Sequence, residues 1–343
     1  MMKALVTGAT GFVGSHVARA LVEAGHDVRV LHRRSSRLDA LQGLDCEAVI
    51  GDVLEREALA QACQGCELVF HVAAVAAYWR TERAQMYAIN VEGTRRVLAA
   101  ARAANVRRMV FTSSAASLGL RRDGRPVDES ARFNLLPHRF PYGHSKHLAE
   151  RCVQHAVKEQ GQDVVIVNPV IVTGPGDLNL ISGRFVTEMQ RLQWLIPVSS
   201  GGVGVVDVRD VARWHLAAAE RGRSGERYIL GNANYSLREW YALCARAVGV
   251  ASPLLQLPDA ALPALAGLVA LARRLGMQSP ADPSQIRMGG RRLHFVYDKA
   301  HSDLGPPQVD ILRSLQETAD WYRARGMLQE GRLGRLLRAL RPG

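Results

Sequence analysis

The residues with the clearest chemical potential are a tyrosine and a lysine four positions apart, Tyr142 and Lys146. In an α-helix this spacing is about one turn, so both side chains extend from the same helix face. A free phenol has a pKa of about 10, and a neighbouring ammonium lowers it by favouring the phenolate. The pair therefore suggests acid–base chemistry at a substrate oxygen, although this spacing alone is common by chance.

A glycine-rich turn near the N-terminus indicates what accompanies that chemistry. Gly8, Gly11 and Gly14 lie between an apolar run that ends at Thr7 and a helical pattern that begins near Val13. Glycine permits a tight turn and lets the backbone approach a pyrophosphate, which then lies at the positive end of the helix. Together with the phenol, the turn predicts hydride transfer with a bound dinucleotide.

The end of the second predicted strand bears on which dinucleotide is bound. NAD sites usually place a carboxylate there to hold the ribose 2′-hydroxyl. This chain has Arg33 and Arg34 instead, and Arg33 is suited to bind a 2′-phosphate through two hydrogen bonds. We therefore expect NADP(H), with NAD(H) possible if both arginines are only solvated loop charges.

Short apolar runs alternate with helical patterns over the first half of the chain. The predicted strands are 4–7, 28–31, 47–50, 68–71, 109–112 and 164–168, and the predicted helices are 13–24, 55–62, 83–104 and 142–160. Such alternation favours a parallel sheet covered on both faces, which is the doubly wound α/β (Rossmann) fold. Its ligand site lies at the carboxyl ends of the strands.

The alternation breaks after residue 173, so a second region is expected. A helix over 207–220, a strand over 227–230 and a helix capped by Ser236 are predicted there. We assign 1–173, rejoined by 205–232, to the dinucleotide-binding domain. Residues 174–204 and 233–328 form a smaller, mostly helical substrate lobe, and 329–343 form a basic amphipathic tail.

Composition limits the functional classes. The chain has 343 residues and a net charge of +12, but its arginines are dispersed and no nucleic-acid-binding motif is present, so a nucleic-acid partner is not expected. The tail, with leucines at helical spacing between arginines, suits an anionic membrane surface or a protein partner, or else caps its own domain. The uninterrupted apolar stretch within 254–275 is too short for a membrane span, which needs about 20 apolar residues, and the segment predicts a buried or lipid-touching surface helix.

Cysteine usage and the N-terminus predict a cytoplasmic protein, with membrane association left open by the tail. No signal peptide precedes the first strand, and the five cysteines show no disulfide framework. Cys63 and Cys66 have redox or metal spacing, but no second pair completes a zinc site. We expect no metal.

The chain resembles the extended short-chain dehydrogenases/reductases, that is, the NAD(P)-dependent epimerase/dehydratase family. The matching motifs occur in order at 7–14, 51–53, 71–74, 90–94, 112–114, 142–146, 168–169 and 174–176. The resemblance implies that Tyr142 exchanges a proton with the substrate oxygen, that Lys146 binds the nicotinamide ribose, and that Ser114 holds that oxygen. Ser113 is the alternative for this role, although the number of residues between the serine and Gly119 favours Ser114. Beside Arg33 and Lys146, the implied cofactor-binding residues are Gly8, Thr10, Gly11, Phe12, Val13, Gly14, Asp52, Val53, Ala73, Ala74 and Pro169.

Within the family, the chain looks most like dihydroflavonol-reductase-like enzymes and hopanoid-associated sugar epimerases. Nucleotide-sugar epimerases usually carry an arginine that binds the diphosphate just before the stretch at 205–212, and small residues replace it here. We therefore expect an NADP(H)-dependent oxidoreductase that interconverts a carbonyl and a secondary alcohol of a small molecule. An NAD-dependent nucleotide-sugar epimerase or dehydratase with tightly bound cofactor is the alternative, and a non-enzymatic dinucleotide sensor is a third.

Other residues have two interpretations. The candidates for the pocket wall, with ordinary packing as the alternative for each, are Tyr78, Trp79, Phe185, Met189 and Trp194. His144 is either a substrate contact or a polar helix residue, and Asn90 is either part of a proton relay or a helix brace. The resemblance also implies a homodimer through the helices at 83–104 and 142–160.

Overall fold

The computed structural model describes residues 1–76, 81–121, 123–276 and 283–328. Its larger part is a seven-stranded sheet with the order β3-β2-β1-β4-β5-β6-β9, in which all pairings are parallel. The strands are β1 (Lys3–Thr7), β2 (Asp27–His32), β3 (Glu47–Ile50), β4 (Leu68–His71), β5 (Arg108–Thr112), β6 (Val164–Pro169) and β9 (Arg227–Leu230). Each predicted strand is present within one or two residues of its expected bounds.

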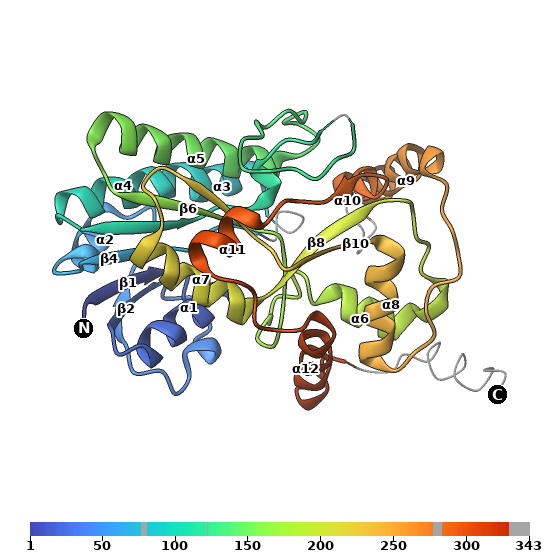
Figure 1. Cartoon of the computed structure of the whole chain (residues 1–343), viewed down its shortest axis with the longest axis horizontal. Coiled ribbons are helices and arrows are strands. Elements are labelled where there is room, and N and C mark those ends of the chain that lie inside the picture. Colours follow the sequence, from blue (N-terminus) through green and yellow to red (C-terminus); the bar gives the residue numbers. More distant parts are fainter. Residues whose placement is uncertain (77–80, 122, 277–282, 329–343) are drawn as a thin grey trace.

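Helices cover both faces of this sheet (Figure 1). One apolar core joins it to α1 (Phe12–Glu23), α7 (Val208–Arg221) and α11 (Asp298–Leu304). The opposite core joins it to α2 (Arg56–Cys63), α4 (Thr94–Ala103) and α5 (Pro141–Gln160). The strands other than the exposed edge strand β3 are buried on both sides, and they consist mainly of apolar residues. The predicted doubly wound fold is confirmed.

The helix predicted over 83–104 is interrupted. It consists of α3 (Arg83–Tyr87), a π-helix (Ala88–Gly93) and α4. The buried Asn90 lies in the π-helix, and its side chain bonds to the backbone of Val75 and to Ser145. Such a turn re-aims a side chain within a helix and has no signature in apolar periodicity.

The substrate lobe contains a second, four-stranded sheet. Its strands are β7 (Ile171–Thr173), β8 (Gly202–Asp207), β10 (Ala233–Ser236) and β11 (Arg292–Leu293), and all three others pair with β8. The helices beside it are α6 (Arg184–Leu192), α8 (Leu237–Val248), α9 (Leu262–Arg274), α10 (Pro283–Met288) and α12 (Ile311–Ala324). The lobe is therefore less purely helical than expected. Residues 171–173 and 205–207, which we assigned to the dinucleotide-binding domain, belong to the sheet of the lobe. From 205–232, only β9 enters the main sheet.

Close backbone approach explains why β8 pairs within the lobe. A Cβ on Gly204 would lie 2.3 Å from the Tyr297 hydroxyl, and one on Gly202 would lie 2.2 Å from the His294 ring. These contacts join residues more than 90 positions apart, so local sequence does not reveal them. The predicted cap at Ser236 is confirmed, because Ser236 and Glu239 form a capping box at the start of α8.

The lobe has its own apolar core between α6, α8, α12 and β8. Trp240 and Tyr322 are its largest fully buried side chains. Within the described part of the chain, no helix has the length and apolarity to cross a bilayer. The tail 329–343 and the candidate wall residues Tyr78 and Trp79 lie outside the described residues.

Candidate active site

A cavity of about 1180 Å³ joins the two parts of the molecule. It extends from the carboxyl ends of β1, β2, β4 and β5 to α9 and α10 in the lobe. Small-ligand sites usually occupy about 300–1,000 Å³, so this cavity has room for a cofactor and a substrate together.

The glycine turn forms the floor of the cofactor end. Gly8 has φ +75°, and a Cβ there would lie 2.6 Å from the Ala73 nitrogen; a Cβ on Gly14 would lie 2.2 Å from the Gly8 carbonyl oxygen. The helix α1 begins at Phe12 with neither a side-chain cap nor an acidic residue in its first turn. Its backbone N–H groups and positive dipole end therefore remain available to a pyrophosphate. Thr10, Gly11, Phe12 and Val13 line the same part of the cavity.

The predicted adenosine and nicotinamide contacts also line this cavity. Arg33 follows β2 with an exposed side chain, and Asp52 and Val53 follow β3. Ala73 and Ala74 follow β4, and Pro169 ends β6. The structure thus brings every sequence-predicted cofactor residue to one cavity, and the donor set fits a dinucleotide.

Ser114, Tyr142 and Lys146 line the cavity where the cofactor end meets the lobe. Ser114 hydrogen-bonds to the Tyr142 hydroxyl. The alternative Ser113 is buried, and its hydroxyl donates to Ser117. The contact with Tyr142 therefore favours Ser114 as the oxygen-binding serine.

The helix α5 positions the tyrosine and lysine because of how it begins and what it buries. Pro141 occupies its first turn, and Gly161 ends it with φ +66°. Its buried face contains Lys146, Ala149, Glu150, Val153 and Ala156 at helical spacing. Lys146 donates to the Thr112 carbonyl oxygen at 2.7 Å, at the end of β5.

The electrostatics of the pair differ from the sequence expectation. Burial raises the pKa of Tyr142, and its hydrogen bond with Ser114 acts in the opposite direction. Burial also lowers the pKa of Lys146 to about 8, while the Glu150 carboxylate raises it. We expected Lys146 to lower the pKa of Tyr142, but the structure aims its ammonium at Thr112, and burial is the larger influence on the phenol.

A buried polar cluster packs behind Ser114 and bonds to its backbone. Glu150 accepts hydrogen bonds from Ser117 and Asn168, both at 2.6 Å, and pairs with Arg227 at 3.4 Å. Asn168 also donates to the Ser114 carbonyl oxygen at 3.1 Å. Glu150 is not among the residues predicted from the sequence, although its position four residues after Lys146 places it on the same helix face.

Two residues with open roles have structural partners. Asn90 bonds to Val75 and Ser145 at 2.7–3.3 Å, which supports the brace interpretation. His144 bonds to the Tyr87 hydroxyl at 2.9 Å. Neither residue lines the cavity.

The substrate end of the cavity is mostly apolar. Phe185 lines it, which agrees with the interpretation of this residue as part of the pocket wall. Met189 instead belongs to the lobe core. Trp194 does not line the cavity. Further wall residues, which the sequence analysis missed, are Leu237, Tyr241, Leu257, Leu262, Leu265, Val269, Ile286, Met288, Leu293 and Phe295.

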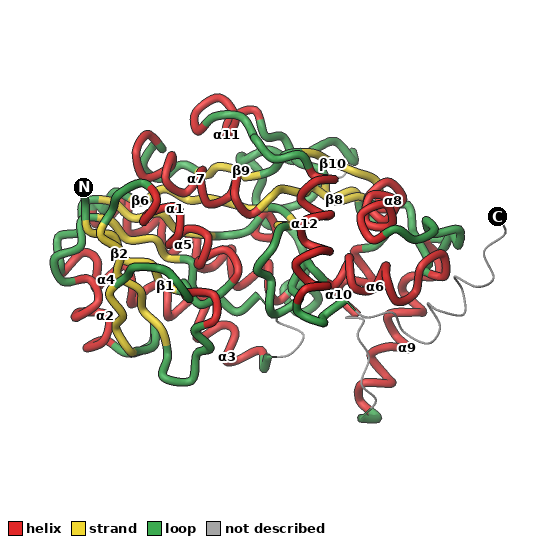
Figure 2. The backbone as a smooth tube through the Cα atoms, turned by 90° about the horizontal axis from the view of Figure 1, so that it is seen from below, coloured by secondary structure: helices red, strands yellow, loops and turns green. Residues whose placement is uncertain are grey.

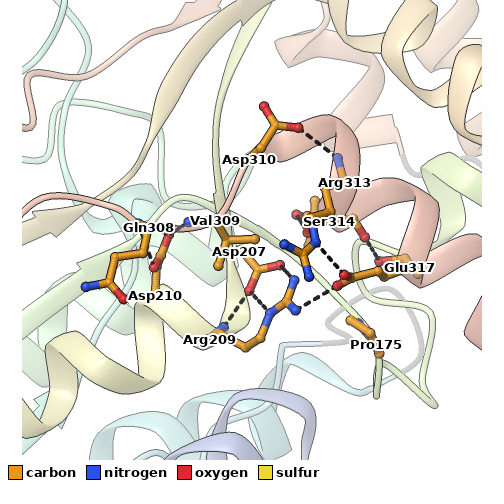
Figure 3. A network of polar contacts seen from close by, with 12 residues as sticks. Pro175, Asp207, Arg209, Asp210, Gln308, Val309, Asp310, Arg313, Ser314 and Glu317 are labelled. Atoms are coloured by element: carbon orange, nitrogen blue, oxygen red, sulfur yellow. Dashed lines mark hydrogen bonds and ion pairs between the residues drawn. The ribbon is translucent and has the colours of Figure 1, made fainter.

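Charged residues also occur at this end. Arg184 pairs with Glu188 at 2.9 Å, and the exposed Arg191 and Arg291 line the cavity. By contrast, Arg209, the arginine that follows β8, contacts Asp207 at 2.9 Å and Glu317 at 2.7 Å (Figure 3). These ion pairs attach α7 to α12, and Arg209 does not line the cavity.

The Cys63 and Cys66 pair shows no sign of reactivity. Both thiols are buried, and burial raises the pKa of Cys63 to about 12. A thiol with a raised pKa is a poor nucleophile and metal ligand. Over the described residues, no group of three or more His, Cys, Asp and Glu side chains is arranged to hold a metal ion.

Comparison with known proteins identifies the family. The sequence profile of the NAD dependent epimerase/dehydratase family matches residues 4–231. The chain belongs to this family, and it is an NAD(P)-dependent oxidoreductase of the extended short-chain dehydrogenase/reductase type.

Individual relatives cover nearly the whole chain. A Synechocystis sp. protein provisionally named dihydroflavonol 4-reductase is 38% identical over 94% of this chain and 95% of its own length. Sterol demethylase protein B of Methylococcus capsulatus is 30% identical over 95% of this chain and 100% of its own. The crystal structure of gox2253 is 34% identical and has a TM-score of 0.84, covering 96% of this chain and 100% of the other.

Proposed function

We propose that this protein is an NADP(H)-dependent oxidoreductase that interconverts a carbonyl and a secondary alcohol on a largely apolar small molecule. The observation that carries the proposal is the Ser114–Tyr142 hydrogen bond at the junction between the glycine cradle and the apolar end of one cavity. A reduced nicotinamide, when bound, supplies the hydride.

In this proposal the chain's own residues bind the oxygen and supply the proton. Ser114 holds the carbonyl oxygen by a hydrogen bond, and Tyr142 donates its phenolic proton as that oxygen gains charge. The raised pKa of Tyr142 keeps the phenol protonated at neutral pH, which suits the reductive direction. Lys146 holds the nicotinamide ribose through hydrogen bonds from its ammonium, which is present below its pKa of about 8.

The cofactor preference rests on Arg33. Its exposed guanidinium lines the cavity at the end of β2, where a carboxylate would repel a 2′-phosphate and a cation attracts it. The substrate preference rests on the apolar wall formed by α8, α9 and α10. The sterol named in one relative supports an apolar substrate of similar kind.

We retain a second candidate function because of two arginines, Arg191 and Arg291. Both line the substrate end, so they could bind a diphosphate that Arg209, held by Asp207 and Glu317, does not reach. In that case the enzyme would be a nucleotide-sugar epimerase or dehydratase that oxidises its substrate transiently and retains NAD.

One experiment separates the two functions. The purified protein is analysed for retained dinucleotide after dialysis. It is then tested for NADPH or NADH consumption with apolar ketones and aldehydes, and for conversion of nucleotide sugars without added cofactor. We expect NADPH consumption with apolar carbonyls. Retained NAD together with nucleotide-sugar conversion would overturn the proposal.

A further inference from the structure

The helix α9 differs from an ordinary surface helix because it is apolar on two faces. From Leu262 to Ala272 it contains no charged or hydrogen-bonding side chain. A surface helix normally pairs an apolar face with a polar one, and a helix that is apolar all round is typically enclosed by protein or lipid. Here α9 lies at the edge of the lobe and projects beyond it in Figure 2.

The inner face of α9 is part of the cavity wall. Leu262, Leu265 and Val269 line the cavity together with Ile286 and Met288 of α10. Leu262 is buried, and Leu265 and Val269 are half-buried. This face of α9 is therefore covered within the protein, where it lies beside α10 and borders the cavity.

The outer face carries leucines that the protein leaves uncovered. Leu268 is 65% exposed, Leu271 is 54% exposed and Leu275, just after the helix, is 72% exposed. Ala264, also exposed, continues the same row at helical spacing. Isolated exposed leucines need no explanation, but a row of them on one helix usually marks an interaction surface.

The segment that contains this row is rich in positive charge, and Arg273 and Arg274 follow the exposed leucines Leu268 and Leu271. Residues 262–297 contain five arginines, Arg273, Arg274, Arg287, Arg291 and Arg292, and a single acidic residue, Asp282. Arg274, Arg291 and Arg292 are exposed. An apolar row with basic residues at its end is the pattern of a helix that lies in the interface of an anionic membrane.

We propose that the outer face of α9 docks on an anionic lipid bilayer, with its leucines in the acyl region and the neighbouring arginines at the headgroups. Because the inner face of the same helix lines the cavity, docking would place the substrate end of the cavity beside the lipid. Entry of an apolar carbonyl compound from the bilayer rests on the proposed function, whereas docking itself does not.

A second copy of the chain fits this surface less well. A symmetric contact would place the same arginines against one another, and opposed like charges disfavour association. Stable interfaces also bury about 800 Å² on each partner, which is more than a row one helix wide supplies. A bilayer requires only such a narrow row.

The test is flotation of the full chain with phosphatidylcholine vesicles, with and without phosphatidylglycerol. Leu268→Glu/Leu271→Glu should lower partitioning onto the anionic vesicles roughly tenfold. The matched control, Leu38→Glu/Leu136→Glu, changes two leucines that are 47% and 51% exposed on the dinucleotide-binding domain. It adds the same charge and should float like the wild type.

Three outcomes would overturn docking through α9: equal flotation of the α9 variant and wild type, absence of wild-type flotation, or a changed sedimentation mass in the α9 variant. A Leu336→Glu/Leu340→Glu variant identifies the tail as the contact if it alone abolishes flotation, which also overturns the proposal.

Leu275→Glu is a second α9 variant in case the double variant does not fold. Reduction of a water-soluble carbonyl should be unchanged in all α9 variants, so a failure of docking and a failure of the proposed function are distinguishable.

Discussion

The two ends of the cavity are built in different ways. The cofactor end depends on backbone geometry and buried polar contacts, such as the Gly8 cradle and the Glu150 cluster. The substrate end consists mainly of apolar side chains from α6, α8, α9 and α10, and all but α6 lie beyond the family match at 4–231. Polar geometry tolerates few residue types, whereas an apolar wall tolerates many of similar volume. We therefore expect the first end to determine the reaction and the second to determine the substrate.

The largest effect should come from removing the proton donor. Tyr142→Phe should lower kcat about 10²–10⁴-fold for every substrate, because the oxygen loses its acid. NADPH affinity, measured by calorimetric titration, should remain unchanged. Turnover equal to that of the wild type would show that Tyr142 is not the acid.

Removing the oxygen-binding hydroxyl should have the next largest effect. Ser114→Ala should reduce kcat about a hundredfold, since one hydrogen bond to the developing charge is lost. The control Ser113→Ala removes a buried hydroxyl bonded to Ser117 and should affect thermal stability more than kcat. The reverse ranking in steady-state kinetics would assign the role to Ser113.

A change at the substrate end should instead discriminate between substrates. Leu265→Trp should lower kcat/KM about tenfold for large apolar carbonyls, because it fills the cavity wall, and should leave small carbonyls unaffected. Leu271→Trp, on the exposed outer face of α9 and outside the cavity wall, is the control. Equal losses for large and small substrates in Leu265→Trp would mean that the two ends are not separable.

The cofactor preference should respond to a single charge. Arg33→Gln should reduce the ratio of NADPH to NADH affinity about tenfold, the usual value of one charge-assisted hydrogen bond. Arg34→Gln, which changes an arginine outside the cavity wall, should not change the ratio. Calorimetric titration of both variants with both dinucleotides gives the ratio.

The smallest effect should be a shift in pH dependence. The pKa of Lys146 is depressed to about 8 and Glu150 raises it, so the ammonium is present below this pKa and is lost as the pH rises through it. Glu150→Gln removes the raising influence, so the alkaline fall of kcat should move to lower pH. Glu159→Gln, an exposed change on the same helix, should leave the profile in place, and a shift to higher pH in Glu150→Gln would contradict the assignment.

The features that could be predicted from the sequence are those set by local spacing, and the features that could not are set by contacts between distant segments. The strands, the glycine turn and the Tyr142–Lys146 pair are predictable because each depends on local spacing. The π-helix around Asn90, the second sheet and the Glu150 cluster depend on contacts between distant segments, such as Gly204 with Tyr297. The uninterrupted apolar pattern of α9 is visible in the sequence, but its two-sided role appears only once α10 is placed beside it.

The most direct test of the central claim follows the hydride. A substrate amount of NADPH carrying two deuterium atoms at C4 is incubated with the protein and an apolar ketone, and the products are analysed by mass spectrometry and NMR. The account predicts deuterium on the carbinol carbon of the released alcohol and an equal amount of NADP⁺. Both deuterium atoms remaining in NADPH, with no labelled alcohol and no NADP⁺, would contradict it.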